Sequence, residues 1–359
     1  MGELSGMAKK KVVYLLGAGA TEAVVRQISP LNGLLTRNIQ DEIRKNHKHG
    51  LNDRVWSELV TEGNDVEHLI SVLDSQHDYH AAERVRTLYR DAIVFLSTKI
   101  SNDPPASNLY AVLLDLHINA DKLQEELLCF LSLNYEDVLE RTIAVHFGKD
   151  IDYEVETSQK TVGKNTAVVL KLHGSFAWKN CRPISVESMT SLTAENTLWI
   201  PPGVDKHREN YPFNLLWGKA SEYLMSCDIL RVVGCSLSRN DWGLIPILYT
   251  AQKFNERGSS ISIEIIDFPH IAEDIRNRYK YLSISSLIDL PDLHSYYGKL
   301  LPKGSRDEIK KLISDTYGGP QTKVNPMGDW LDAKIEHLVV NRKATLARAA
   351  IAHKFYHKV

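Results

Sequence analysis

The strongest constraint on the fold is a short apolar strand that leads directly into a glycine-rich turn. Residues 11–16 are rich in β-branched and aliphatic side chains, and they are followed by G-A-G-A-T at 17–21 and a segment with helical character. Glycine lets the backbone turn sharply and approach a ligand closely, and free amides at a helix N-terminus bind phosphate. The stretch therefore predicts a site for a nucleotide diphosphate, most simply a dinucleotide, although such a turn can also serve packing alone.

Length, charge and cysteine spacing argue against several classes of protein. A length of 359 residues suits one large α/β domain with an insertion or a tail. A net charge of −2 argues against a general nucleic-acid-binding surface. No apolar run approaches the roughly 20 residues that a membrane helix needs, and the four cysteines contain no C-x-x-C pair. We therefore expect a cytoplasmic, reduced protein without membrane contact, sequence-specific nucleic-acid binding or a bound metal.

Further strands alternate with helices along the chain. Strands are predicted over residues 127–133, 166–172, 229–233 and 260–266, whereas residues 30–127 have helical patterns only. Strands that alternate with helices form a parallel sheet with right-handed crossovers. The sequence thus predicts a Rossmann-like α/β fold over residues 10–270, with a helical insertion at about 30–127 and a helical C-terminal region at 271–359. Prolines and glycines in residues 176–212 predict an irregular loop over the site.

Polar residues follow the carboxyl ends of the predicted strands, where ligands bind in open parallel sheets. Asn134 follows one strand and His173 follows the next, so both side chains can enter one crevice. Alone, the asparagine could be a helix N-cap and the histidine a supporting group. Together they suit cleavage of a ribosyl C–N bond through an oxocarbenium-like transition state. The amide would hold hydroxyls and water, and the imidazole would accept a proton.

Hydride transfer by a Rossmann dehydrogenase is disfavoured. Such enzymes carry G-x-G-x-x-G and an acidic residue at the end of a second strand about 20 residues further on. In this chain Glu22 stands at the position of the third glycine, and helical sequence replaces the second strand. The glycine turn is therefore expected to hold a dinucleotide in another way.

Four motifs, in this order along the chain, carry a resemblance to a known family. They are G-A-G-A-T at 17–21, L-N-Y-E-D at 133–137, K-L-H-G-S at 171–175 and G-C-S-L-S-R-N-D at 234–241. Together they resemble the sirtuin-like domains of bacterial NAD hydrolases in anti-phage defence. The resemblance covers about residues 10–270, and it implies a Rossmann-like catalytic domain with NAD as its substrate.

The resemblance also implies a role for each matching residue. Asn134 would be the catalytic asparagine beside the nicotinamide ribose, and His173 the catalytic histidine. The family usually has Asp two residues after the asparagine; Glu136 stands there and Asp137 follows, so either could face the nicotinamide. The pyrophosphate of NAD would be cradled by Gly17, Ala18, Gly19, Ala20 and Thr21. The adenosine ribose would be contacted at Gly234 and Ser236, with Asp267 assisting.

The expected activity is therefore that of an NAD⁺ glycohydrolase, a gated effector of anti-phage defence that cleaves NAD to nicotinamide and ADP-ribose. Protein deacylation is disfavoured, because the zinc ribbon of paired cysteines found in sirtuin deacylases is absent; a non-catalytic sensor of NAD or ADP-ribose stays open. A homo-oligomer and a partner such as a HerA-type ATPase are implied. Residues 271–359 would pack on the core or form the oligomer or partner interface.

Overall fold

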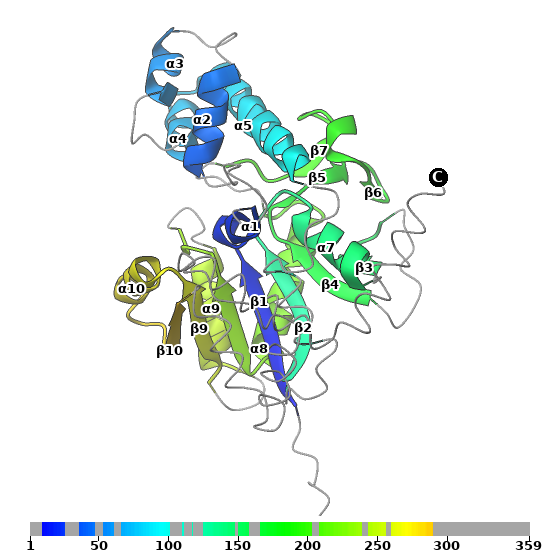
Figure 1. The fold of residues 1–359 in the computed structure, drawn as a ribbon, viewed down its shortest axis with the longest axis vertical. Helices are drawn as coiled ribbons and strands as arrows, with labels where there is room; N and C mark the ends of the chain where they lie inside the picture. Colours follow the sequence, from blue (N-terminus) through cyan, green and yellow to red (C-terminus); the bar gives the residue numbers. More distant parts are fainter. Residues whose placement is uncertain are drawn as a thin grey trace, which may run out of the picture.

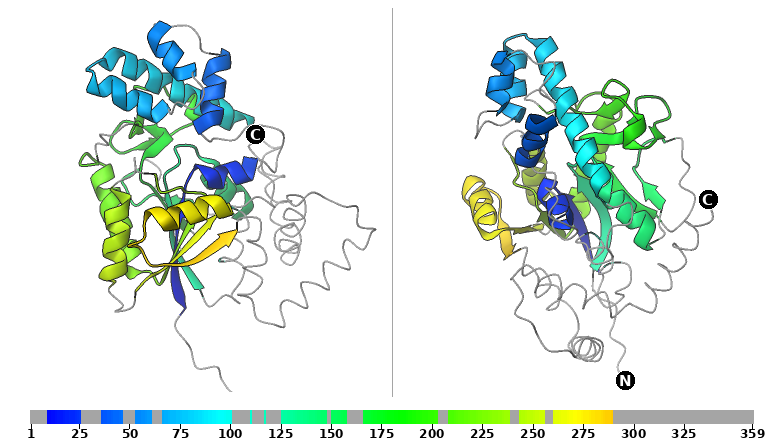
Figure 2. Two further views of the ribbon diagram at one scale, coloured as in Figure 1. Left: turned by 90° about the vertical axis from the view of Figure 1, so that its left-hand side faces the viewer. Right: turned by 45° about the horizontal axis from the view of Figure 1, so that its top comes forward.

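The predicted α/β architecture is confirmed in the computed structural model, which describes residues 9–25, 36–46, 53–60, 66–100, 110, 117, 125–147, 150–157, 166–202, 208–238, 243–255 and 260–289. A seven-stranded sheet forms the centre, its strands pair in parallel, and helices cover both faces (Figures 1 and 2). The strands are β1 (Lys10–Leu16), β2 (Glu125–Ser132), β3 (Asp150–Asp152), β4 (Thr166–Lys171), β8 (Ile229–Val233), β9 (Ser262–Asp267) and β10 (Ile284–Asp289).

Strand order explains where a ligand site can form. The order across the sheet is β10-β9-β8-β1-β2-β4-β3, so the chain builds outward from β1 on one side and then returns to build outward on the other. In open parallel sheets ligands bind at such a reversal, beyond the carboxyl ends of the two strands that flank it, here β1 and β8. Both strands are apolar and buried over most of their length, as expected for a sheet covered on both faces.

The helices between the strands pack their apolar sides on the sheet. Helix α8 contacts β1, β2 and β4, and α9 packs beside α8. Helix α7 begins at Val138, shortly after β2 ends. The helices that flank the sheet are α1 (Ala18–Val25), α7 (Val138–Phe147), α8 (Phe213–Ser226), α9 (Leu244–Lys253) and α10 (Pro269–Arg278).

The predicted helical insertion lies beyond the carboxyl ends of the strands, above α1 in Figure 1. Among the described residues between β1 and β2, every regular element is a helix. Val66, Leu69, Ile70 and Leu73 are spaced to share one face of a helix, and all four are buried. The helices are α2 (Thr36–Asn46), α3 (Asp53–Val60), α4 (Val66–Ser75) and α5 (Tyr79–Lys99).

The prediction of an irregular loop over residues 176–212 is corrected by the structure. A three-stranded antiparallel sheet of order β6-β5-β7 lies there, built from β5 (Gly174–Lys179), β6 (Ser185–Val186) and β7 (Thr197–Trp199), with a 3-10 turn at Met189–Ser191. Arg90 of α5 fastens this sheet to the insertion: its guanidinium donates to Thr197 Oγ1 (3.2 Å) and to the carbonyl of Leu192 (2.7 Å). The insertion and the small sheet therefore form one structure over the strand ends.

The sheet also extends past residue 270, into the region predicted to be helical. Helix α10 begins at Pro269, and edge strand β10 pairs in parallel with β9. The α/β unit thus reaches at least Asp289, and the strand is a feature that the sequence pattern did not predict. Residues 290–359, most of the predicted helical C-terminal region, lie outside the described residues. Within the described part of the chain, helices are too short or too polar to cross a membrane.

Candidate functional site

Strand register brings the two predicted catalytic residues to the same edge of the sheet. Ser132 of β2 pairs with Lys171 of β4, and Asn134 and His173 each follow two residues later. Leu16, the last residue of β1, pairs in turn with Ser132. The side chains of Asn134 and His173 therefore leave adjacent strands level with the glycine turn after β1.

The glycine turns after β1 and β8 are packed against each other. A Cβ atom at Gly17 would lie 2.6 Å from the carbonyl oxygen of Gly234, and one at Gly19 would lie 2.8 Å from it. Gly234 has a φ of +54°, and a Cβ there would meet the amide nitrogen of Ala20 at 2.0 Å. These glycines are therefore required by backbone packing where the turns after β1 and β8 meet, as the packing interpretation of the turn predicts.

Several amides of the predicted phosphate cradle already donate within the protein. Gly17 N donates to Val233 O (3.1 Å), Gly19 N to Gly234 O (2.8 Å) and Ala20 N to Gly17 O (3.0 Å). An anion at this turn would thus depend on the positive end of the α1 dipole more than on those amides. Ala18 is exposed at the first position of α1, whereas Ala20 and Thr21 are buried.

Asn134 is held by hydrogen bonds to the β1 turn rather than serving as a helix cap. Its side-chain nitrogen Nδ2 donates to Gly17 O (3.0 Å) and to Thr21 Oγ1 (3.0 Å). The hydroxyl of Tyr110 lies 2.7 Å from Thr21 Oγ1 and 3.5 Å from Nδ2. Thr21 and Tyr110 are completely buried, or nearly so, and this network fixes the orientation of the amide.

Glu136 and Asp137 point in different directions. Glu136 is buried; its Oε1 accepts from Thr21 Oγ1 (2.5 Å) and its Oε2 accepts from Val138 N (3.0 Å), so it caps α7. Asp137 instead pairs with Arg141 of α7 (3.0 Å) and is partly exposed. Of the two carboxylates, Glu136 is the one that shares hydrogen bonds with the Asn134 network.

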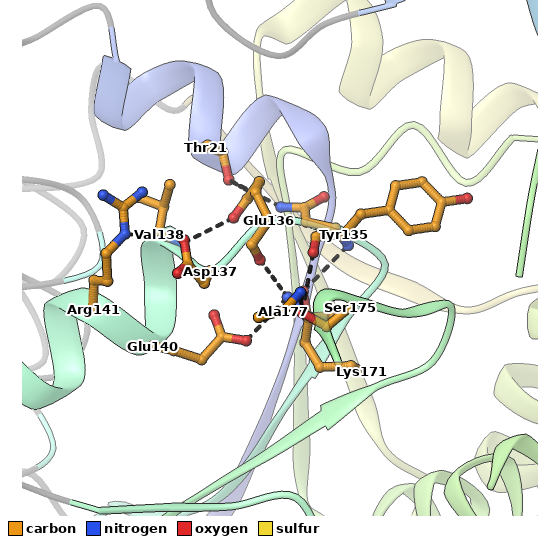
Figure 3. A network of polar contacts seen from close by, with 12 residues as sticks. Thr21, Tyr135, Glu136, Asp137, Val138, Glu140, Arg141, Lys171, Ser175 and Ala177 are labelled. Atoms are coloured by element: carbon orange, nitrogen blue, oxygen red, sulfur yellow. Dashed lines mark hydrogen bonds and ion pairs between the residues drawn. The ribbon is translucent and has the colours of Figure 1, made fainter. Parts of the chain in front are cut away.

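Lys171 lies below the loop that carries Asn134 in the view of Figure 3, and it supports that loop. Its ammonium group is almost fully buried, donates to the carbonyl of Glu136 (2.5 Å) and lies 3.1 Å from Glu140 Oε1. Burial raises the pKa of the Glu140 carboxyl, and the charge of Lys171 opposes that rise. On the same side, Ser175 Oγ donates to Tyr135 O (3.2 Å). The loop is thus bound to β4 and β5 at several points.

His173 lies in a cluster of aromatic rings. Its ring centroid is 6.0 Å from that of Tyr135 and 6.4 Å from that of Trp217. Phe176 stacks on Tyr135 at 4.9 Å, and Trp199 meets both rings edge-on at 5.4 and 5.1 Å. The imidazole is therefore shielded from water, which strengthens its interactions with nearby charge.

The ends of β8 and β9 carry the remaining predicted residues. Ser236 is exposed, and its carbonyl accepts from Arg278 Nη1 (3.2 Å) of α10. Asp267 is buried at the end of β9, where its Oδ1 accepts from Phe268 N (2.7 Å). Asp267 and Gly234 follow neighbouring strands, and Gly234 N donates to Ile266 O (3.0 Å). All predicted site residues therefore lie along one edge of the sheet.

We expect Asp267 to impose a pH dependence on stability. Burial raises the pKa of its carboxyl from 3.8 to about 6, against the opposing effects of the Phe268 amide and His270. The folded state then binds this proton more tightly than the unfolded state does. The stabilising contribution of the protonated carboxyl is complete below about pH 4 and is lost as the pH rises to about 6.

The measurement is the free energy of urea unfolding from pH 4 to pH 8 for the wild type and Asp267→Asn. Relative to the variant, the wild type should lose about 2–3 kcal/mol between pH 4 and pH 6 and then level off. Asp150→Asn, at an exposed position of β3, is the matched control and should show no such difference. A constant difference between wild type and Asp267→Asn over this range would contradict the assignment.

Some residues of the site were not singled out by sequence patterns. Tyr110, Phe176 and Trp217 belong to none of the motifs, and Tyr135 lies inside L-N-Y-E-D without an assigned role. Lys171 did carry a signal, because a lysine inside an apolar strand is a buried charge that needs a partner. Among the described residues, no group of three or more His, Cys, Asp or Glu side chains could hold a metal ion.

Comparisons with known proteins complete the description. No protein-family model matches the chain, and no curated protein matches its sequence. A structure from a study of the mechanism and regulation of Sir2 enzymes is 14% identical, covers 84% of this chain and 94% of its own, and has a TM-score of 0.37. A complex of a Sir2 homolog with NAD is 17% identical, with coverage of 81% and 88% and a TM-score of 0.38. These values are low, and the fold rests on this chain's own strand pairing.

Proposed function

We propose that this protein hydrolyses the bond between nicotinamide and ribose in NAD, releasing nicotinamide and ADP-ribose. The observation that carries the proposal is the placement of Asn134 and His173 two residues beyond the paired positions Ser132 and Lys171 of adjacent strands. The glycine turn after β1 lies level with them at the crevice where the strand order reverses. An amide, an imidazole and a helix N-terminus would thus share one site of the kind that binds dinucleotides.

The chemistry requires few groups from the protein. As the C–N bond breaks, its electron pair leaves with nicotinamide, and positive charge develops on the ribose. Water adds to the anomeric carbon and loses a proton, so that NAD and water yield nicotinamide, ADP-ribose and a proton. Asn134 would hold the water and a ribose hydroxyl in place, and His173 would accept a proton. The rings around His173 would exclude bulk water.

The rest of NAD would extend along the strand ends. The diphosphate would lie at the N-terminal end of α1, where the helix dipole favours negative charge. The adenosine ribose would lie toward Gly234, Ser236 and Asp267, beyond β8 and β9. Glu136 rather than Asp137 would face the nicotinamide side, because it shares the Thr21 hydroxyl with Asn134.

The proposal includes a biological setting. Continuous hydrolysis of NAD would kill the host cell, so the enzyme would be a cytoplasmic effector of anti-phage defence held silent until a trigger arrives. Assembly into a homo-oligomer, or binding of a HerA-type ATPase, would release the activity. An isolated protein that is monomeric and fully active would overturn the gating part of this proposal.

The test is product analysis with the purified full chain. The protein would be incubated with NAD alone, with NAD and an acetyl-lysine peptide, and with NAD and the proteins encoded beside this one. Hydrolysis predicts equal amounts of nicotinamide and ADP-ribose without the peptide. Nicotinamide release that depends on the peptide would instead indicate a deacylase. Bound but intact NAD under every condition would indicate a sensor and would overturn the proposal.

A further inference from the structure

The hydrogen bonds around Asn134 fix which side of its amide faces the crevice. Gly17 O is a backbone carbonyl and can only accept, so the atom 3.0 Å from it is the amide nitrogen Nδ2. The same nitrogen donates to Thr21 Oγ1 at 3.0 Å. Both amide hydrogens are therefore used toward the β1 turn, and the oxygen Oδ1 is directed to the opposite side as a hydrogen-bond acceptor.

The Thr21 hydroxyl is the centre of this network, and its polarity is also determined. Its hydrogen is donated to Glu136 Oε1 at 2.5 Å. Its two lone pairs are left to accept from Asn134 Nδ2 and from the hydroxyl of Tyr110, 2.7 Å away. Every hydrogen-bonding position of this buried hydroxyl is thus filled, and Tyr110 must be a donor.

Tyr110 is well suited to remain that donor. It is 1% exposed, and burial raises the pKa of its hydroxyl well above 10, with the nearby charge of Glu136 raising it further. The hydroxyl therefore keeps its proton throughout the physiological pH range. Its oxygen also lies 3.5 Å from Asn134 Nδ2, so it borders the amide as well as Thr21.

We propose that Tyr110 is a positioning residue that acts through Thr21 to hold the Asn134 amide with Oδ1 toward the substrate. The inference rests on the proposed hydrolysis of NAD, in which Oδ1 accepts from the attacking water or from a ribose hydroxyl. Without the tyrosine hydroxyl, one lone pair of Thr21 Oγ1 would have no donor. The Thr21 hydroxyl would then be held less firmly against Asn134 Nδ2. The amide would then spend time in orientations that present Nδ2, a donor, where an acceptor is needed.

The experiment compares Tyr110→Phe with Tyr223→Phe in the full-length protein. Both changes remove one hydroxyl and keep the ring; that of Tyr223 donates to Glu154 (2.5 Å), and neither Tyr223 nor Glu154 makes any of the hydrogen bonds that hold the Asn134 amide. For Tyr110→Phe we expect kcat for nicotinamide release to fall about 5- to 10-fold with KM within about twofold, corresponding to one hydrogen bond. Tyr223→Phe should leave both constants unchanged. An unchanged kcat in Tyr110→Phe would overturn the proposal, and a higher kcat would show instead that Tyr110 blocks the site.

A second readout does not depend on NAD turnover. The side-chain amide signal of Asn134 can be followed by NMR in protein labelled with ¹⁵N-asparagine and identified by its loss in Asn134→Asp. Its hydrogens should exchange with solvent about 5- to 10-fold faster in Tyr110→Phe than in the wild type. Equal exchange rates would overturn the positioning role. If the wild type releases no nicotinamide, the proposed function fails, and this measurement still decides whether Tyr110 orients the amide.

Discussion

Replacement of His173 by alanine is expected to lower kcat for nicotinamide release by about 10²- to 10⁴-fold, which is the usual contribution of a positioned general base. His173 is the buried imidazole at the strand ends, level with Asn134, and its ring lies among aromatic side chains. Water in the vacated space cannot accept a proton as readily at neutral pH. Asn134→Ala should cause a loss of similar order, because the attacking water and ribose lose their fixed partner.

These kinetic effects must be separated from loss of folding. His80→Ala, at an exposed position of α5, is the matched control for the histidine and should retain the wild-type rate. Melting temperatures of His173→Ala and the wild type should be compared, since the ring also fills space in the aromatic cluster. A folded His173→Ala protein with more than about a tenth of the wild-type kcat would exclude it as the general base.

Arg231→Met is expected to destabilise the protein by about 3–5 kcal/mol, the largest effect on stability that we anticipate. The Arg231 side chain is completely buried in β8 and makes a bidentate pair with Glu125 of β2, with both N–O distances at 2.8 Å. Its Nε is also 2.8 Å from Glu264 of β9. Removal of the cation would leave two buried carboxylates with no opposite charge between them.

The pKa of Glu125 supports this interpretation. Burial alone would raise that pKa, but hydrogen bonds and charge from Arg231 outweigh burial and hold it below its ordinary value. The pair therefore stabilises the fold above the unfolded pKa, and the contribution is lost as the pH falls through the folded value. In Arg231→Met the balance is expected to reverse, because burial is then opposed only by the smaller effects of His117 and Lys10 on the pKa of the Glu125 carboxyl.

Urea unfolding measures this effect, with two further variants for comparison. Arg276→Met removes an arginine whose pairing with Glu273 is exposed, and should change stability by less than about 0.5 kcal/mol. A triple variant with Arg231→Met, Glu125→Gln and Glu264→Gln should recover much of the lost stability, because the buried cation and both buried carboxylates are then removed at once. A loss below about 1 kcal/mol in the single variant would show that the network contributes little.

Much of the fold was predictable because the central strands are buried on both faces. Such strands appear in sequence as short apolar runs, and those ending near Leu133, Leu172 and Val233 were found with nearly correct ends. Their order could not be derived from local pattern, but alternation with helices was enough to predict a parallel sheet. The polar residues at the strand ends then followed from the rule that ligands bind beyond carboxyl ends.

The missed elements share a physical cause. Strands β6 and β7 have only two or three residues, and they exist because β5 pairs with them across a loop. Edge strand β10 has the sequence I-S-S-L-I-D, in which polar residues interrupt the apolar run. Local periodicity carries little information about such strands, because pairing partners distant in sequence determine them.

The candidate site shows the same limit. Sequence spacing located Asn134 and His173, but it could not separate Glu136 from Asp137, since adjacent loop residues have no fixed direction. In the structure Glu136 turns inward to Thr21 and Asp137 turns outward to Arg141. Tyr110 joins the network from a distant part of the chain, and only three-dimensional contact reveals it.

The most direct test of the site is a crystal structure of the protein with ADP-ribose. The diphosphate should lie at the N-terminal end of α1, and the ribose that carried nicotinamide should lie within hydrogen-bond reach of Asn134 Oδ1, directly or through one water. His173 should border the same ribose. ADP-ribose bound elsewhere on the protein, or with its terminal ribose directed away from Asn134 and His173, would contradict the proposed site and the hydrolysis assigned to it.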